Sequence, residues 1–296
     1  MDPISVAVSR GAFVESVHRV HAVAVRDGVV AAAFGSPDLT TSLRSSAKPF
    51  QALQLVRSRD DLDDVDVAIA SASHNADPAQ IAAVRALLAK APATEADLEV
   101  GIQEGRPPEP IYHNCSGKHA GMLAVCRARG WETEGYRLAG HPLQEAILDE
   151  IAESAEVPRA QVQTAVDGCG VLCFALPLER VAFMFSRLER RDGGSQIAEA
   201  MRAHPRLVGG AGRPDSDWME SLPGWVAKGG AEGLLCAAGP DGTGVALKSA
   251  DGSFRPLRAT VPLVFAEIGI DAGDRFGAKA VRNSRGEEVG TVAATT

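Results

Sequence analysis

Ser45 and Lys48 stand three residues apart, directly before an apolar helical run through Phe50, Leu53 and Val56. Residues at this spacing share one face of a helix, so we expect the serine hydroxyl to lie within reach of the lysine amine. A serine hydroxyl attacks at neutral pH only when a base takes its proton, and a desolvated lysine can be that base. Backbone N–H groups at the helix start would stabilise the resulting oxyanion. The alternative interpretation is a helix-capping serine beside a solvated lysine.

Two further motifs could complete a cleft around this pair. Ser73 lies two residues before Asn75, between an apolar run and a predicted helix, and Lys228 is followed by Gly229 and Gly230 before a predicted hairpin. Penicillin-recognising serine acyltransferases carry a similar ordered set, which consists of a serine-lysine pair, a second serine and a glycine-flanked lysine. An ordered match of three motifs is much rarer by chance than a match of one, so we expect all three to line one cleft.

Two lysines in one cleft would change each other's chemistry. Each positive charge disfavours the other, so each lysine lowers the pKa of its neighbour and at least one can act as a base. We therefore expect two serine-lysine pairs, Ser45 with Lys48 and Ser73 with Lys228. One pair would supply the nucleophile, and the other would relay a proton to the leaving group.

A separate group of residues has the chemistry of a metal site. Cys115 and Lys118 are three residues apart, and Cys169 lies between two glycines. Thiolates suit zinc, a neutral lysine is an unusual third ligand, and His119 is the other nitrogen donor close by. From the spacing alone, two buried structural thiols are the preferred interpretation. The odd number of cysteines, 5 in all, favours free thiols or metal ligands over disulfides.

Composition and charge narrow the functional classes. The chain has 296 residues, of which 45% are hydrophobic and 23% charged, and its formal net charge is -8. We do not expect such an acidic chain, which has no basic cluster, to bind nucleic acid. The N-terminus has neither a basic nor an apolar signal region, and no apolar stretch approaches the length that spans a bilayer. We therefore expect a cytoplasmic protein that does not bind membranes.

The elements around the first two motifs can be predicted from local patterns. An antiparallel hairpin or meander is predicted by β-rich runs at 4–8, 21–25 and 29–34. The acidic run 60–66 predicts a solvated loop. Asp77, Pro78 and Gln80 have the pattern of a helix N-terminus. The connection that carries Ser73 is thus fixed at its far end.

The remaining elements predict one α/β domain. Helices are expected at about 118–130, 177–188, 195–203, 215–221 and 261–268. Runs at 234–237 and 245–248 predict a hairpin beside Lys228, and a polar tail follows the last helix. We expect a single domain over residues 1–296, made of two packed lobes, with the helical lobe roughly at 50–225.

Several of these motifs together resemble the thermolabile, rhizobial-type L-asparaginases. The stretches that carry the resemblance are Arg44–Pro49, Ala72–His74, Asn114–His119, Gly140–Pro142 and Asp167–Cys169. The resemblance implies an α/β fold like that of serine β-lactamases, penicillin-binding proteins and glutaminases, in which helices flank an antiparallel sheet and a second lobe is mostly helical. The sequence departs from the family pattern at Asn75, where serine is common, and after Cys169, where a proline often follows soon.

The resemblance also implies an activity and a cofactor. The expected reaction is the hydrolysis of L-asparagine to L-aspartate and ammonia, usually by a homodimer. A zinc site near the active site would match Cys115, Lys118 and Cys169, and we expect zinc not to be strictly essential for the chemistry. This implication overrides the preference for structural thiols that spacing alone gives.

These expectations give each motif residue a role. Ser45 would attack the side-chain amide, Lys48 would take its proton, and Ser73 with Lys228 would protonate the departing ammonia. The roles of the two serines could be exchanged.

We expect the substrate to contact Arg44, His74, Asn75, Asp167 and Gly229. Arg44 could bind the substrate carboxylate or form a surface ion pair, and Asp167 could bind the ammonium or orient a zinc ligand. His74 fits a hydrogen-bonded structural residue better than a base, since lysines fill that role. The alternatives are a β-lactamase-like, peptidase-like or glutaminase-like serine amidohydrolase acting on another amide, and a non-catalytic zinc protein.

Overall fold

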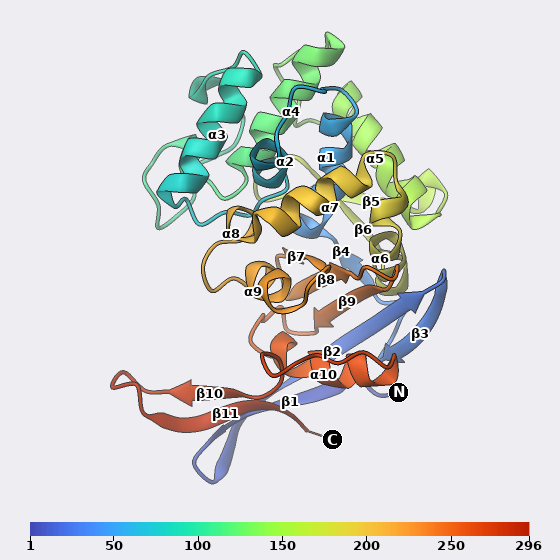
Figure 1. Cartoon of the computed structure of the whole chain (residues 1–296), viewed down its shortest axis with the longest axis vertical. Helices are drawn as coiled ribbons and strands as arrows, with labels where there is room; N and C mark the ends of the chain where they lie inside the picture. The colour runs from blue at the N-terminus through green and yellow to red at the C-terminus, as the bar shows by residue number, and fades with distance from the viewer. Residues whose placement is uncertain (296) are drawn as a thin grey trace.

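The computed structural model describes residues 1–295, which form an antiparallel sheet with helices around it (Figure 1). Within these residues the main sheet has eight strands in the order β10-β11-β1-β2-β9-β8-β7, and β3 also pairs with β2. The strands are β1 (Ile4–Arg10), β2 (Phe13–Arg26), β3 (Val29–Phe34), β7 (Val226–Gly230), β8 (Leu234–Ala238), β9 (Gly244–Ser249), β10 (Lys279–Arg282) and β11 (Glu288–Thr295). The first and last strands of the chain are neighbours, with Ser5 opposite Thr295.

A second, smaller sheet lies beside the helical part of the molecule. It contains β4 (Thr40–Ser42), β5 (Gln163–Val166) and β6 (Leu172–Pro177), with β6 in the middle. Strand β4 leads into the short 3-10 helix η1 (Arg44–Ala47), and the turn between β5 and β6 carries Asp167 and Cys169. This small sheet therefore brings two distant parts of the predicted site to the same place.

Most helices gather on one side of the main sheet, in the upper half of Figure 1. These are α1 (Lys48–Val56), α2 (Asp64–Ala70), α3 (Pro78–Lys90), α4 (Ser116–Arg129), α5 (Pro142–Ala155), α7 (Gly194–Ala203) and α8 (Pro205–Val208). The remaining short 3-10 helices are η2 (Glu95–Asp97), η3 (Pro110–Tyr112), η4 (Arg159–Gln161) and η5 (Leu188–Arg190). Helix α1 contacts α4, α5 and α7, so the helix that begins with Lys48 is central to this group.

Three further helices pack on the main sheet. They are α6 (Leu178–Ser186), α9 (Pro214–Ser221) and α10 (Leu257–Glu267). Helix α6 lies across β2, β8 and β9, and a Cβ at Gly244 of β9 would overlap the carbonyl of Ala182 in α6. Glycine is thus required where this helix approaches the strand most closely. Helix α9 packs against β7, beside Lys228.

The expected architecture, an antiparallel sheet flanked by helices with a mostly helical region beside it, is confirmed. The meander at the start and the hairpin beside Lys228 are present as β1–β3 and β8–β9. The loop prediction for residues 60–66 is wrong in part, because α2 begins at Asp64. Asp63 and Asp66 cap this helix reciprocally, and of the two only Asp66 is buried.

The polar tail predicted after the last helix is instead the β10–β11 hairpin. No helix within residues 1–295 is long and apolar enough to cross a bilayer. The division into two lobes, with the helical one at 50–225, stays a prediction, as does the homodimer.

Candidate active site

Lys48 lies at the junction between η1 and α1 and points into the protein. Its side chain is 1% exposed. The amine donates hydrogen bonds to the carbonyl of Ala72 at 2.5 Å and to the hydroxyl of Ser73 at 3.0 Å. Ser45, three residues earlier in η1, is half-buried, and its hydroxyl forms no hydrogen bond with another described residue. Ser73 therefore pairs with Lys48, and the expected pairing of Ser73 with Lys228 is replaced by this one.

Ser73 lies in the connection between α2 and α3 and is held there by backbone contacts. Its N–H donates to the carbonyl of Val208 at 2.8 Å, and the next N–H, that of His74, donates to the carbonyl of Asn114 at 3.2 Å. At the far end of the connection, the side-chain carbonyl of Gln80 accepts from the backbone N–H of Asp77, as the helix-start pattern predicted. The connection is thus fixed at several points.

His74 is fully buried, and both of its ring nitrogens are used within the protein. The hydroxyl of Ser116 donates to the carbonyl of Ile111, so it accepts from the Nε2–H of His74 at 2.9 Å, while Nδ1 accepts from the N–H of Ala76. Burial is the main cause that lowers the pKa of His74 to about 3, and the charge of Lys48 lowers it further. His74 is therefore a neutral structural residue, and its ring has no free atom for the expected substrate contact.

Lys228, in the central part of β7, has a carboxylate partner that sequence reasoning missed. Its amine donates to Asp215 Oδ2 at 2.5 Å and to the carbonyl of Gly229 at 3.0 Å, and both members of the ion pair are almost fully buried. Asp215 also accepts from the N–H of Gly229 at 3.0 Å. The backbone of Gly229 is thus occupied by this pair and is not free for the expected substrate contact.

The signal that could have identified Asp215 is physical and not a sequence motif. A buried lysine ammonium needs a counter-charge, and Asp215 comes at the start of the predicted helix 215–221, a short distance before the lysine. Burial alone would raise the pKa of Asp215, but the charges of Lys228 and Arg213 lower it overall.

The electrostatics around Lys48 lower the pKa of its amine. Burial is the main cause that lowers its pKa, to about 8. The nearby positive charges of Lys118 and Lys228 lower it further, against an opposing effect of Cys115. The neighbouring lysines thus lower this pKa in the expected direction, although burial is the larger cause, and the role of Lys48 as a base stays a prediction.

Arg44 directly precedes Ser45 in the chain and forms an ion pair with Asp167. The Nε of Arg44 donates to Asp167 Oδ1 at 2.6 Å, and that oxygen also accepts from the N–H of Gly168. Arg44 has φ 46°, a left-handed backbone conformation that is uncommon for a residue other than glycine. Such strain persists where the surrounding structure fixes it, and it is common at functional sites. Of the two alternatives for Arg44, the ion pair is present.

Asn75 is half-buried and is covered by the segment 208–217, which joins α8 to α9. Gly210 in this segment has φ 118°, and a Cβ there would overlap the side-chain amide of Asn75. Only glycine allows this backbone approach. The same segment therefore contacts Ser73 through Val208, covers Asn75, and supplies Asp215 to Lys228.

The three predicted metal ligands are brought together. Cys115 precedes α4, Lys118 lies in the first turn of that helix, and the Lys118 amine donates to the sulfur of Cys169 at 3.0 Å. The neighbouring Cys169 is the main cause that lowers the pKa of Cys115 well below its usual value, while burial opposes it and Lys48 and Lys118 lower it further. Two buried sulfurs suit zinc, whereas an amine is an unusual ligand. Burial alone would lower the pKa of Lys118, but Cys169 and Cys115 raise it overall, so the amine would have to lose a proton before it could bind a metal.

Histidine and carboxylate ligands do not extend this cluster. Within residues 1–295 there is no group of three or more histidine, cysteine, aspartate and glutamate side chains arranged to hold a metal ion. The nearby His119 uses Nδ1 to accept from the hydroxyl of Tyr136, which itself accepts from the N–H of Glu99. A metal ion at the predicted ligands would therefore need Lys118 as its third ligand.

Comparison with known protein families agrees with the motifs. A sequence profile of the family described as L-asparaginase II matches residues 6–294. The chain belongs to the L-asparaginase II family. The matched range includes every residue of the site described above, from Arg44 to Gly229. No curated protein sequence matches the chain.

Several solved structures are similar to this member of the L-asparaginase II family, although at low identity. One is a putative β-lactamase from Bacteroides dorei (13% identity, TM-score 0.41, covering 90% of this chain and 92% of that one). A second is a simvastatin synthase mutant from Aspergillus terreus (14% identity, TM-score 0.39, covering 77% and 86%). A third is a β-lactamase from Mycobacterium bovis (16% identity, TM-score 0.33, covering 79% and 88%).

Proposed function

We propose that this protein is an L-asparaginase that hydrolyses L-asparagine to L-aspartate and ammonia through an acyl-enzyme. The family supports amide hydrolysis. The observation that carries the mechanism is the buried Lys48 amine, which has a lowered pKa and donates to the hydroxyl of Ser73. A lysine in this state accepts a proton near neutral pH, as a serine hydrolase requires.

In the proposed mechanism Ser45 is the nucleophile. Its Oγ attacks the side-chain carbonyl carbon of asparagine, and its proton passes to the neutral amine of Lys48. The surroundings of Ser45 support this role, because Ser45 is half-buried and not hydrogen-bonded to another described residue. Ser73, by contrast, is only 2% exposed and so less accessible to a substrate. Free backbone N–H groups at the start of η1 supply donors for the oxyanion.

Ser73 then carries the proton to the leaving group. The ammonium of Lys48 donates to Ser73 Oγ, and the hydroxyl of Ser73 donates its proton to the departing amide nitrogen as the C–N bond breaks. Water next attacks the acyl-enzyme, with Lys48 as base, and releases aspartate and Ser45. Lys228, in its ion pair with Asp215, contributes a fixed positive charge to the site and does not relay the proton.

The Arg44–Asp167 pair is the proposed binding site for the amino acid part of the substrate. Asparagine carries one carboxylate and one ammonium group, which are complementary to a guanidinium and a carboxylate that lie together. Arg44 directly precedes the proposed nucleophile in the chain, and both side chains are partly exposed, at 28% for Arg44 and 10% for Asp167. Asn75 is the remaining polar side chain of the predicted set that is not fully buried.

We further propose that Cys115, Lys118 and Cys169 hold a zinc ion. Zinc would supply a structural link between the start of α4 and the turn between β5 and β6, together with positive charge near Lys48. These three residues on their own already tie the two segments together through hydrogen bonds.

The test is ammonia release by the purified protein on L-asparagine, with L-glutamine and a chromogenic cephalosporin in parallel. Ser45→Ala and Lys48→Met should each abolish turnover of asparagine, while Ser284→Ala, at an exposed position on the β10–β11 turn, should keep it. If both Ser45→Ala and Lys48→Met retain most of the wild-type rate, the mechanism is wrong. Cleavage of cephalosporin or glutamine without cleavage of asparagine would reject the substrate.

A further inference from the structure

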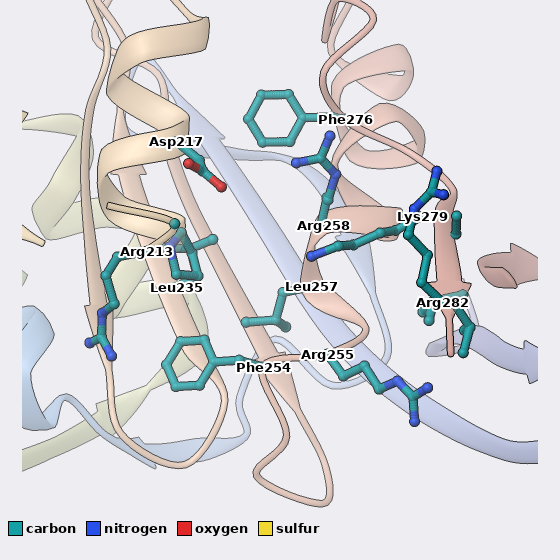
Figure 2. Close-up of a pocket in the computed structure, with 15 residues that line it drawn as sticks. Arg213, Asp217, Leu235, Phe254, Arg255, Leu257, Arg258, Phe276, Lys279 and Arg282 are labelled. Carbon is teal, nitrogen blue, oxygen red and sulfur yellow. The ribbon is translucent and has the colours of Figure 1, made fainter. Parts of the chain in front are cut away.

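A cavity of about 570 Å³ lies outside the site described above, between α9, the start of α10 and the β10–β11 hairpin (Figure 2). None of the residues assigned to the asparaginase site lines it. Cavities of this size accommodate small organic molecules. The residues around it therefore indicate what kind of molecule it would take.

The walls of the cavity are strongly cationic. The basic residues that line it are Arg213, Arg255, Arg258, Lys279 and Arg282. Arg282 forms an ion pair with Glu288, whereas for the other four no carboxylate within residues 1–295 lies at ion-pair distance. The Nε atoms of Arg213 and Arg258 are also buried without a hydrogen-bond partner among these residues. Unpaired buried donors on several cations are unfavourable in an empty cavity and favourable around an anion.

The side chains are arranged to meet a ligand inside the cavity. Figure 2 shows the Lys279 side chain extending from β10 toward the middle of the cavity and the Arg258 guanidinium lying beside Phe276. Arg255 points toward the outer rim. Three of the cations, Arg255, Lys279 and Arg282, are exposed, so an anion can reach them from solvent.

The floor of the cavity is apolar and includes aromatic rings. It is formed by Leu235, Phe254, Leu257, Phe276 and Val292. Phe276 is held by an edge contact with Trp218, at 5.2 Å between ring centroids. A small inorganic anion would leave this surface uncovered, so the floor favours a ligand that also has a flat apolar part.

One acidic residue, Asp217 on α9, also lines the cavity, across from Arg258 in Figure 2. A carboxylate repels a bare anion but accepts hydrogen bonds from neighbouring hydroxyl groups. A phosphate group would match the cations, and a flat ring would match the apolar floor. A hydroxylated linker between the two would match this carboxylate. A nucleoside monophosphate has all three parts.

We propose that this cavity binds a nucleoside monophosphate, with the phosphate at Lys279 and the arginines and the base on the apolar floor beside Phe254. Its position also connects it to the proposed catalytic site. The ring of Phe254 and the carboxylate of Asp215 both lie against Gly229, and Arg213 is close enough to Asp215 to lower the pKa of that carboxyl group. Binding itself does not depend on the asparaginase proposal.

The experiment is isothermal titration calorimetry of the full-length protein with adenosine 5′-monophosphate, adenosine and inorganic phosphate. Adenosine 5′-monophosphate should bind at least tenfold more tightly than either of the other two. The double variant Arg255→Glu/Lys279→Glu should weaken its binding at least tenfold. Arg285→Glu is the matched control, since it reverses an exposed charge on the same hairpin but outside the cavity.

Two results would overturn this proposal. One is no heat of binding for adenosine 5′-monophosphate at millimolar concentration, and the other is equal binding by the double variant and the wild type. Thermal unfolding of both variants checks that they are folded, which is expected because Arg255 and Lys279 are exposed. Asparagine turnover in the same preparations separates failure of the cavity proposal from failure of the catalytic one.

Discussion

The amine of Lys48 donates a hydrogen bond to the hydroxyl of Ser73 across 3.0 Å, although the two residues are 25 positions apart in the chain. The nearer serine, Ser45, has the spacing that a helical face would bring to the lysine, yet the lysine side chain turns inward to the connection after α2. The described hydrogen bonds of the Lys48 amine thus go to Ser73 and Ala72, and its role as base for Ser45 belongs to the proposed mechanism.

The pKa of Lys48 gives a direct prediction for pH dependence. Because burial lowers this pKa to about 8, the amine is mostly protonated at pH 7 and becomes a base as the pH rises. The value of kcat/KM for asparagine should increase about tenfold per pH unit below pH 8 and level off above it. A profile of kcat/KM from pH 5.5 to 10 measures this increase. An increase of kcat/KM centred near pH 6 would instead indicate a histidine base.

The Lys228–Asp215 pair predicts a large effect on stability. Asp215→Asn removes the counter-charge of a fully buried ammonium and should lower the free energy of unfolding by about 3–5 kcal/mol. Urea denaturation followed by tryptophan fluorescence gives this value. Asp217→Asn, two positions along the same helix and less buried, is the control, with an expected loss below about 1 kcal/mol. If Asp215→Asn and Asp217→Asn lowered the free energy of unfolding equally, the buried Lys228–Asp215 pair would not have the predicted effect on stability.

The Arg44–Asp167 pair predicts an effect on substrate binding. If Arg44 holds the substrate carboxylate, Arg44→Gln should raise KM for asparagine at least about tenfold, which corresponds to about 1.4 kcal/mol. The effect of Arg44→Gln on kcat should be smaller, because in the proposed mechanism the Arg44 guanidinium does not contact the amide bond that breaks. Arg285→Gln, on an exposed turn, should change neither constant. If Arg44→Gln had the wild-type KM for asparagine, Arg44 would not be part of the substrate-binding site.

The cysteine cluster predicts zinc binding that can be measured apart from activity. Elemental analysis of the purified protein should find about one zinc per chain, and Cys169→Ser should lose it because one of three donors is gone. Cys126→Ser replaces another buried thiol of the chain and should keep the metal. Zinc-free wild-type protein after growth in zinc-supplemented medium would reject the site, as would equal zinc content in the two variants.

Local sequence patterns predicted much of the fold. The reciprocal contact between Gln80 and Asp77, the early strands and the hairpin after Lys228 depend on residues close in sequence, and each is present. The three predicted metal ligands also meet. This contact was inferred from the family resemblance and not from spacing, since Cys169 is 51 positions from Lys118.

The partners within the site could not be predicted in the same way. Whether Ser73 faces Lys48 or Lys228 depends on how the connection after α2 packs against α1 and α8, which no local pattern encodes. The role of Asp215 depends on α9 packing against β7. His74 lies inside a motif of the family, and only its burial and two ring contacts reveal that it supports the backbone.

The segment 208–217 has a thermodynamic consequence. It holds the N–H of Ser73 through Val208, covers Asn75 with Gly210, and presents Arg213 to the cavity and Asp215 to Lys228. A molecule that shifts this segment by binding in the cavity would therefore also change the contacts of the segment in the proposed catalytic site, and the reverse holds for a molecule that binds in the catalytic site. Linkage then requires reciprocity, so any change that occupancy of the cavity makes to the affinity for asparagine is returned by asparagine in equal measure.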